Sequence, residues 1–150
     1  MMSNVFNTTF EISMRVLMVL LVDEKPKSAD MIAAIDFLAV YGKTFDITEN
    51  NLHGNNFYKY GEFATRRNMV KKAIRQLLQN DMVDVYEKED GFYFMANDLG
   101  LDFRSSLDSE YAHEYSNAVR AASTYVGTKS DTQVVKEIIS KSSTGLRIGD

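Results

Sequence analysis

The feature that most constrains this 150-residue chain is that its first two predicted helices are apolar on every face. The capping-box pattern of Thr8 and Glu11 predicts a first helix that begins at Thr8 and runs to about Val22. Ser28 is a suitable cap for a second helix, which we expect to end near Tyr41. A helix that is apolar all round must be buried all round, so we expect a second body to cover these two helices.

The side chains expected to meet that second body come from both helices. Methionine suits such a role because its flexible, polarizable side chain adapts to irregular surfaces. We therefore predict a partner interface, the predicted apolar interface, that consists of Met14, Leu17, Met18, Leu21, Met31, Ile35, Phe37 and Leu38.

A long polar loop and a basic helix are expected next. Residues 43–57 are rich in Asn, Thr, Asp and Gly, and a loop of this length is usually functional or mobile. Apolar residues then recur at helical spacing between Gly61 and Asn80, which predicts a third, amphipathic helix.

After the third helix the spacing of the apolar residues changes: they now alternate with other residues, as in a β-strand. The β-rich runs 82–87 and 91–95 flank a turn that ends in Asp90-Gly91, a pattern typical of a hairpin. Alternation places Phe92 and Phe94 on one face, which we assign to the core.

Helical patterns return at the end of the chain. We expect a helix after Asn97-Asp98 to about Leu107, a longer one from the cap Ser109 to Val126, and a short one over residues 132–141. The predicted fold class is α+β, mainly α: a winged helix-turn-helix with a C-terminal helical extension. We divide it into a winged-helix domain (1–96), the extension (97–141) and a flexible tail (142–150).

Composition excludes several kinds of site. The chain has no Cys and only two His, His53 and His113, which removes thiolate metal sites, a Cys nucleophile and His-based metal motifs. We find no catalytic constellation and expect neither enzymatic activity nor a cofactor.

The longest apolar run, residues 16–22, is far shorter than the roughly 20 residues of a membrane helix. We therefore expect no membrane partner and a cytoplasmic location.

The net charge of −4 hides an uneven distribution. The segment 57–80 has a net charge of +5, which leaves −9 for the rest of the chain. Its cations can contact DNA phosphates, bind an acidic protein or form a plain solvated surface. Two features disfavour a standard helix-turn-helix. The connection between the second and third helices is about twenty residues long instead of three or four, and the hairpin tip 88–90 is acidic. The six cations are Lys59, Arg66, Arg67, Lys71, Lys72 and Arg75.

Two further polar positions allow more than one interpretation. Asp36 lies on an apolar helix, so it is either the buried partner of an arginine or the one exposed position of that helix. His53 and Glu62 can be drawn as an acid–base pair, but we favour a structural or interface hydrogen bond between them.

Several short motifs, taken in order, resemble one known family. They are Asn4–Ile12, Ile35–Val40, Leu52-His53, Tyr58–Glu62, Arg66-Arg67 and Phe103–Ala112. Together they resemble the Middle Component 2 family of bacterial ABC-three-component systems. The likeness spans about residues 4–126 and leaves the chain after Gly127 unassigned. Residues 54–56 depart from the family pattern, in which prolines commonly follow the Leu-His pair.

The resemblance implies a small winged-helix subunit without catalysis of its own. Such subunits are encoded with an SMC-like ABC ATPase and an effector, often a nuclease, as in Lamassu-type defence against phage and plasmids. The resemblance implies an adaptor that joins the ATPase to the effector and contacts DNA or an acidic subunit. It also indicates a family-motif polar cluster of Asp36, His53, Tyr58 and Glu62. The alternative is a winged-helix transcription regulator that dimerises through its terminal helices.

Overall fold

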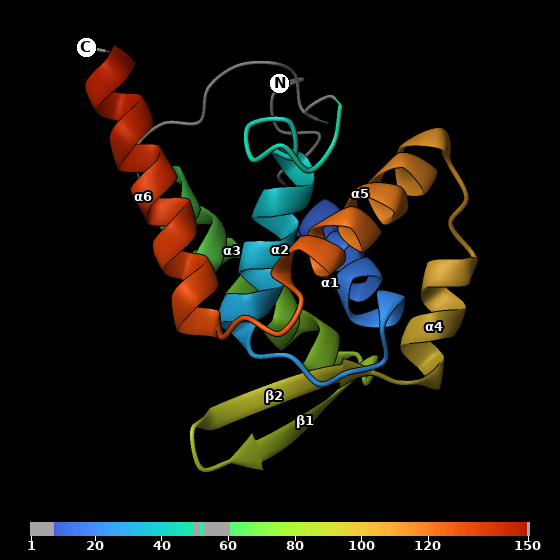
Figure 1. Ribbon diagram of the computed structural model, residues 1–150. Helices are drawn as coiled ribbons and strands as arrows, with labels where there is room; N and C mark the ends of the chain where they lie inside the picture. Colours follow the sequence, from blue (N-terminus) through green and yellow to red (C-terminus); the bar gives the residue numbers. More distant parts are fainter. Residues whose placement is uncertain (1–7, 50–51, 53–60, 150) are drawn as a thin grey trace.

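A computed structural model describes residues 8–49, 52 and 61–149, with side chains as far as Lys141 (Figure 1). Over this part of the chain the fold is mainly helical α+β, with six helices and one antiparallel hairpin. The elements are α1 (Thr9–Val22), α2 (Ala29–Val40), α3 (Glu62–Gln79), β1 (Val83–Lys88), β2 (Gly91–Ala96), α4 (Asp98–Ser105), α5 (Glu110–Val126) and α6 (Asp131–Gly149).

The predicted helix starts are confirmed by their capping bonds. The Thr8 hydroxyl accepts a hydrogen bond from the backbone N–H of Glu11 at 3.1 Å. Ser28 and Ser109 cap α2 and α5 in the same way, each through the N–H three residues on. Because these caps depend on residues close in sequence, local pattern alone was enough to place them.

α2 forms the centre of the fold. Figure 1 shows it surrounded by α1, α3, α5 and α6, and every residue from Met31 to Val40 is buried. The covering side chains include Tyr115 and Val119 of α5 and Val134 and Ile138 of α6, all of them fully buried. The N-terminal and C-terminal helices therefore share one hydrophobic core.

This packing corrects the predicted apolar interface. Seven of its eight side chains are buried in the core of the chain itself, and the eighth, Leu21, is partly buried against it. The pattern correctly indicated burial on all sides, but it cannot tell cover by another protein from cover by later helices of the same chain. The buried residues are Met14, Leu17, Met18, Met31, Ile35, Phe37 and Leu38.

The hairpin is confirmed, with Val83 opposite Ala96 at its base and Lys88 opposite Gly91 at its turn. A single bridge extends it on the side of β2, where the backbone of Lys27 exchanges two hydrogen bonds with Phe94, at 3.1 and 2.8 Å. Phe94 is buried as predicted, but Phe92 is 58% exposed, so its assignment to the core is wrong. The distal half of the hairpin extends beyond the helices that cover its base.

The last helix is longer than predicted. α6 continues to Gly149, so residues 142–149 are helical and the expected end near Lys141 is wrong. The prediction followed the low helix propensity of Ser142-Ser143-Thr144-Gly145, which is only a weak prior.

α4 lies against α1 and the junction between α3 and β1, and Gly100 permits this approach. A Cβ atom at this position would lie 2.4 Å from the backbone oxygen of Met82 and 3.1 Å from a methyl group of Leu17. Only glycine fits here, because the backbone oxygen cannot rotate away as a side chain could.

Candidate functional site

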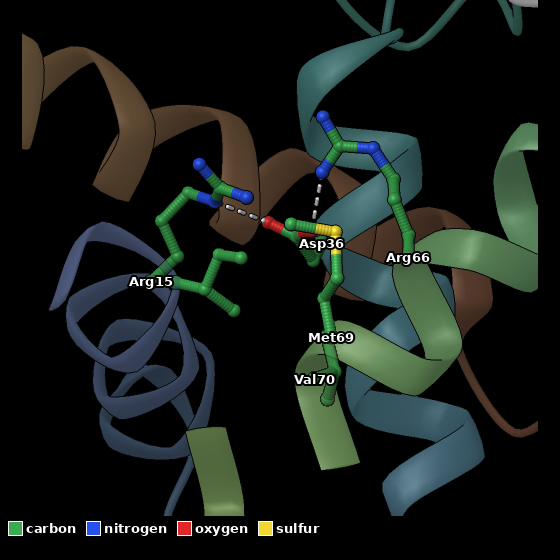
Figure 2. A pocket seen from close by; sticks show the side chains of 6 residues that line it. Arg15, Asp36, Arg66, Met69 and Val70 are labelled. Atoms are coloured by element: carbon green, nitrogen blue, oxygen red, sulfur yellow. Dashed lines mark hydrogen bonds and ion pairs between the residues drawn. The ribbon is translucent and has the colours of Figure 1, made fainter. Parts of the chain in front are cut away.

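The carboxylate of Asp36 is the centre of a buried polar cluster. The Arg15 Nε atom of α1 donates to Oδ1 at 2.9 Å, and the Arg66 Nη1 atom of α3 donates to Oδ2 at 2.9 Å. The Tyr115 hydroxyl of α5 also donates to Oδ1, at 2.6 Å. Figure 2 shows the two arginines reaching Asp36 from different helices. We call these four residues the Asp36 cluster.

The Asp36 cluster lies in the interior, where Arg15 is 2%, Asp36 1% and Arg66 6% exposed and Tyr115 is fully buried. A second carboxylate, Glu62, lies 3.6 Å from the Nε atom of Arg66 and accepts a hydrogen bond from the Tyr41 hydroxyl. Two guanidinium groups therefore face two carboxylates. Charge balance of this kind is needed because an unpaired charge in the interior is very costly.

Burial and neighbouring charges shift three pKa values in the same direction. Burial would lower the pKa of Arg15, but the negative Asp36, its hydrogen bond to Arg15 and the neighbouring Tyr115 and Tyr111 together raise it. Burial, reinforced by Asp36, raises the pKa of Tyr115 well above its usual value. Burial also raises the pKa of Tyr111, beside Arg15, to about 12. Both tyrosines therefore remain neutral and can act as hydrogen-bond donors over the whole physiological range.

The structure settles the interpretation of Asp36 and divides the predicted family-motif polar cluster. Asp36 is the buried partner of arginines, and Arg66 links it to Glu62. The other two members, His53 and Tyr58, lie outside the described residues. The sequence analysis missed Arg15 and Tyr115, although a single arginine within an apolar helix was a usable indication that it needs a buried acidic partner.

The predicted basic residues are of two kinds. Arg66 is buried on Asp36, which contradicts its assignment to phosphate contact. Arg67 is about one-third exposed and donates to Asp30 of α2 from Nη2 at 2.9 Å and from Nε at 3.1 Å. The sequence could not separate these arginines from the lysines, because Asp36 and Asp30, to which they donate hydrogen bonds, lie 30 and 37 residues away.

Lys71, Lys72 and Arg75 are exposed, and we call them the α3 basic face; Lys59 lies outside the described residues. Nine residues correspond to two and a half helical turns, so Arg75 points away from the side on which Arg66 is buried. No acidic residue occurs between Phe63 and Asn80. The rest of the exposed surface of α3 is small or polar: Ala64, Thr65, Asn68, Gln76 and Gln79.

The Asp36 cluster is packed too tightly to bind a substrate. The crevice beside it, lined by Ile12, Met69 and Val70 together with the charged groups, is too narrow to admit a water molecule (Figure 2). Within the described residues no three His, Cys, Asp or Glu side chains lie together as metal ligands would. In the same part of the chain, no helix has the length and apolar character to cross a membrane.

A family model described as ABC-three component (ABC-3C) system Middle Component 2 matches residues 5–146. The chain belongs to this family. No curated protein and no solved structure matches it. The match to the Middle Component 2 model extends past residue 126, where the resemblance described in the sequence ends, and covers most of α6. Residues 128–146, which the resemblance left unassigned, are therefore part of the Middle Component 2 match.

In this Middle Component 2 protein, the Asp36 cluster joins four helices. Its members come from α1, α2, α3 and α5. Arg15, Arg66 and Tyr115 are 21, 30 and 79 residues away from Asp36 along the chain. The cluster is thus an internal structural element. Surfaces available to other molecules include the α3 basic face, which the same arginine pairs hold in a fixed orientation, and the exposed part of the hairpin.

Asp36→Asn is expected to destabilise the protein by about 3–5 kcal/mol, because it leaves two buried guanidinium groups without their carboxylate. Asp30→Asn is the matched control: it lies on the same helix and pairs with the adjacent arginine, but both partners are about one-third exposed. Its cost should be about 0–1 kcal/mol. Urea unfolding of both variants measures the difference. Equal losses would contradict the structural role assigned to Asp36.

Alkaline pH should destabilise the protein through its buried tyrosines. A raised pKa means that the neutral phenol stabilises the folded state, so this contribution is complete below pH 10 and is lost as the pH approaches the folded value of about 12 for Tyr111. The slope should reach about 1.4 kcal/mol per pH unit for each such group. Tyr111→Phe should flatten the decline of the unfolding free energy between pH 9 and 11.5, whereas Tyr86→Phe, at an exposed position, should follow the wild type.

Proposed function

We propose that this Middle Component 2 chain is a non-catalytic adaptor subunit that links an SMC-like ABC ATPase to an effector nuclease. The observation that carries the proposal is the family match over residues 5–146, because a middle component of a multi-component system has partner proteins. The tightly packed Asp36 cluster supports a role without catalysis, since its crevice has no room for a substrate. We further propose Lamassu-type antiviral defence in the cytoplasm as the setting.

We also propose that the N-terminal part is a winged helix. The order α1, α2, α3, β1, β2 supports this assignment. The bridge between Lys27 and Phe94 supports it independently, because it pairs one residue of the segment before α2 with the free edge of β2. The long segment between Val40 and Glu62 makes the arrangement unlike a standard helix-turn-helix, in which three or four residues join these helices.

DNA contact, in this proposal, belongs to the α3 basic face. Lys71, Lys72 and Arg75 lie within five residues and point to solvent, and no acidic side chain of the described residues is paired with them. The exposed Asn and Gln of the same helix add hydrogen-bond donors for phosphate or sugar oxygens. An acidic protein is the alternative ligand for this face, and the absence of an apolar side chain larger than alanine among its exposed residues favours DNA.

The adaptor role is tested by reconstitution with the two proposed partners, the ABC ATPase and the effector of the same system. The tagged chain, co-expressed with both, should elute with them as one complex in size-exclusion chromatography. The ATPase and the effector mixed without the chain should elute separately. A soluble lone monomer that elutes apart from both components would overturn the proposal.

DNA contact is tested by Lys71→Glu combined with Lys72→Glu. Duplex affinity should fall about tenfold or more, equally on two unrelated sequences, and the slope of log affinity against log salt should decrease by about 2. Lys136→Glu with Lys141→Glu makes the same change in charge at exposed positions of α6 and should leave both quantities unchanged. A salt slope unaffected by the α3 reversal would assign the face to a protein instead.

A further inference from the structure

The hairpin carries an apolar surface that the core leaves uncovered. Cross-strand register places Val85 directly opposite Phe94, and Phe92 follows diagonally on the same face, nearer the turn. Val85 is 47% and Phe92 58% exposed, and Tyr86 is exposed on the opposite face. Figure 1 shows the hairpin as an outlying layer below the helices, with its turn at the end remote from α4.

The same hairpin is strongly acidic. Four exposed carboxylates, those of Asp84, Glu87, Glu89 and Asp90, accompany a single cation, Lys88. Glu87 is directly opposite Phe92 across the two strands, so negative charge lies beside the most exposed aromatic ring. The charge of the hairpin is therefore opposite in sign to that of the α3 basic face.

Contacts within the hairpin hold its tip in one conformation. The Tyr93 hydroxyl donates to the Asp90 carboxylate at 2.7 Å, and the Lys88 ammonium lies over the Tyr93 ring, 4.6 Å from its centre. A surface ordered before binding loses less conformational entropy when a partner binds, so less interaction energy is spent on ordering it.

We propose that the hairpin is a protein-docking element whose partner surface has an apolar pocket surrounded by lysine or arginine side chains. Phe92 and Val85 would fill the pocket, since aromatic side chains supply much of the binding energy at protein interfaces. Glu87 and Glu89 would face the basic rim and speed association. Nucleic acid does not suit this surface, because phosphates would meet four carboxylates. The inference rests on the proposed adaptor function, since we place the partner among the other components of the system.

Removal of the apolar anchors provides the first test. Val85→Thr with Phe92→Thr keeps β-branched or strand-compatible side chains at two exposed positions, so melting temperature and circular dichroism should not change. The probes are the purified ABC ATPase and the purified effector, each in surface plasmon resonance with the full chain. We expect the dissociation constant for one of them to rise about tenfold or more. Leu101→Gln with Ile139→Gln, at similarly exposed positions elsewhere, is the control and should bind as the wild type does.

Removal of the charges provides the second test. Glu87→Gln with Glu89→Gln should slow association about threefold to tenfold at low salt and flatten the salt dependence of the rate, while dissociation changes less. The variant of Lys71 and Lys72 described above should retain component binding, which separates the two surfaces.

The outcomes distinguish this inference from the adaptor proposal. If the wild-type chain binds neither component, both are overturned. If it binds a component and both hairpin variants bind equally well, the docking role of the hairpin alone is overturned. If the hairpin variants lose DNA affinity instead of protein affinity, the hairpin belongs to nucleic-acid binding and the inference is likewise wrong.

Discussion

The fold depends on one buried carboxylate shared between two arginines. Asp36 and its partners Arg15 and Arg66 have almost no contact with water, so each charge is tolerated only in the presence of the others. A hydrophobic core alone would permit α1, α2, α3 and α5 to slide relative to one another, whereas the directional bonds of the Asp36 cluster favour one register. The cluster also fixes the rotation of α3, since the side that holds Arg66 must face inward. The α3 basic face is exposed for this reason.

The modest net charge of the chain is the sum of two opposed surfaces. The α3 basic face and the acidic hairpin follow one another directly in sequence, yet their charges have opposite sign. Long-range electrostatic attraction depends on such local patches more than on the total, because screening limits each patch to roughly 10 Å. A chain with net charge −4 can therefore attract phosphates at one element and repel them at the next.

Sequence analysis succeeded where the determining residues are neighbours and failed where they are distant. The capping residues Thr8, Ser28 and Ser109 and the hairpin turn at Asp90-Gly91 act within a few positions, and all were predicted. Tyr115 reaches Asp36 across 79 residues, and nothing in local pattern identifies such a pair. The cover of α1 and α2 by α5 was missed for the same reason: an apolar helix surface shows that it needs a partner but does not show which one.

The connection between α3 and the hairpin matters for an adaptor. The backbone N–H of Met82 donates to the carbonyl of Leu77 at 2.9 Å, and the Asn97 side chain donates to the carbonyl of Asp81 at 2.8 Å. These bonds tie both ends of the hairpin to the C-terminal end of α3. Under the proposed function, a displacement of α3 by DNA would therefore move the hairpin with it as one body.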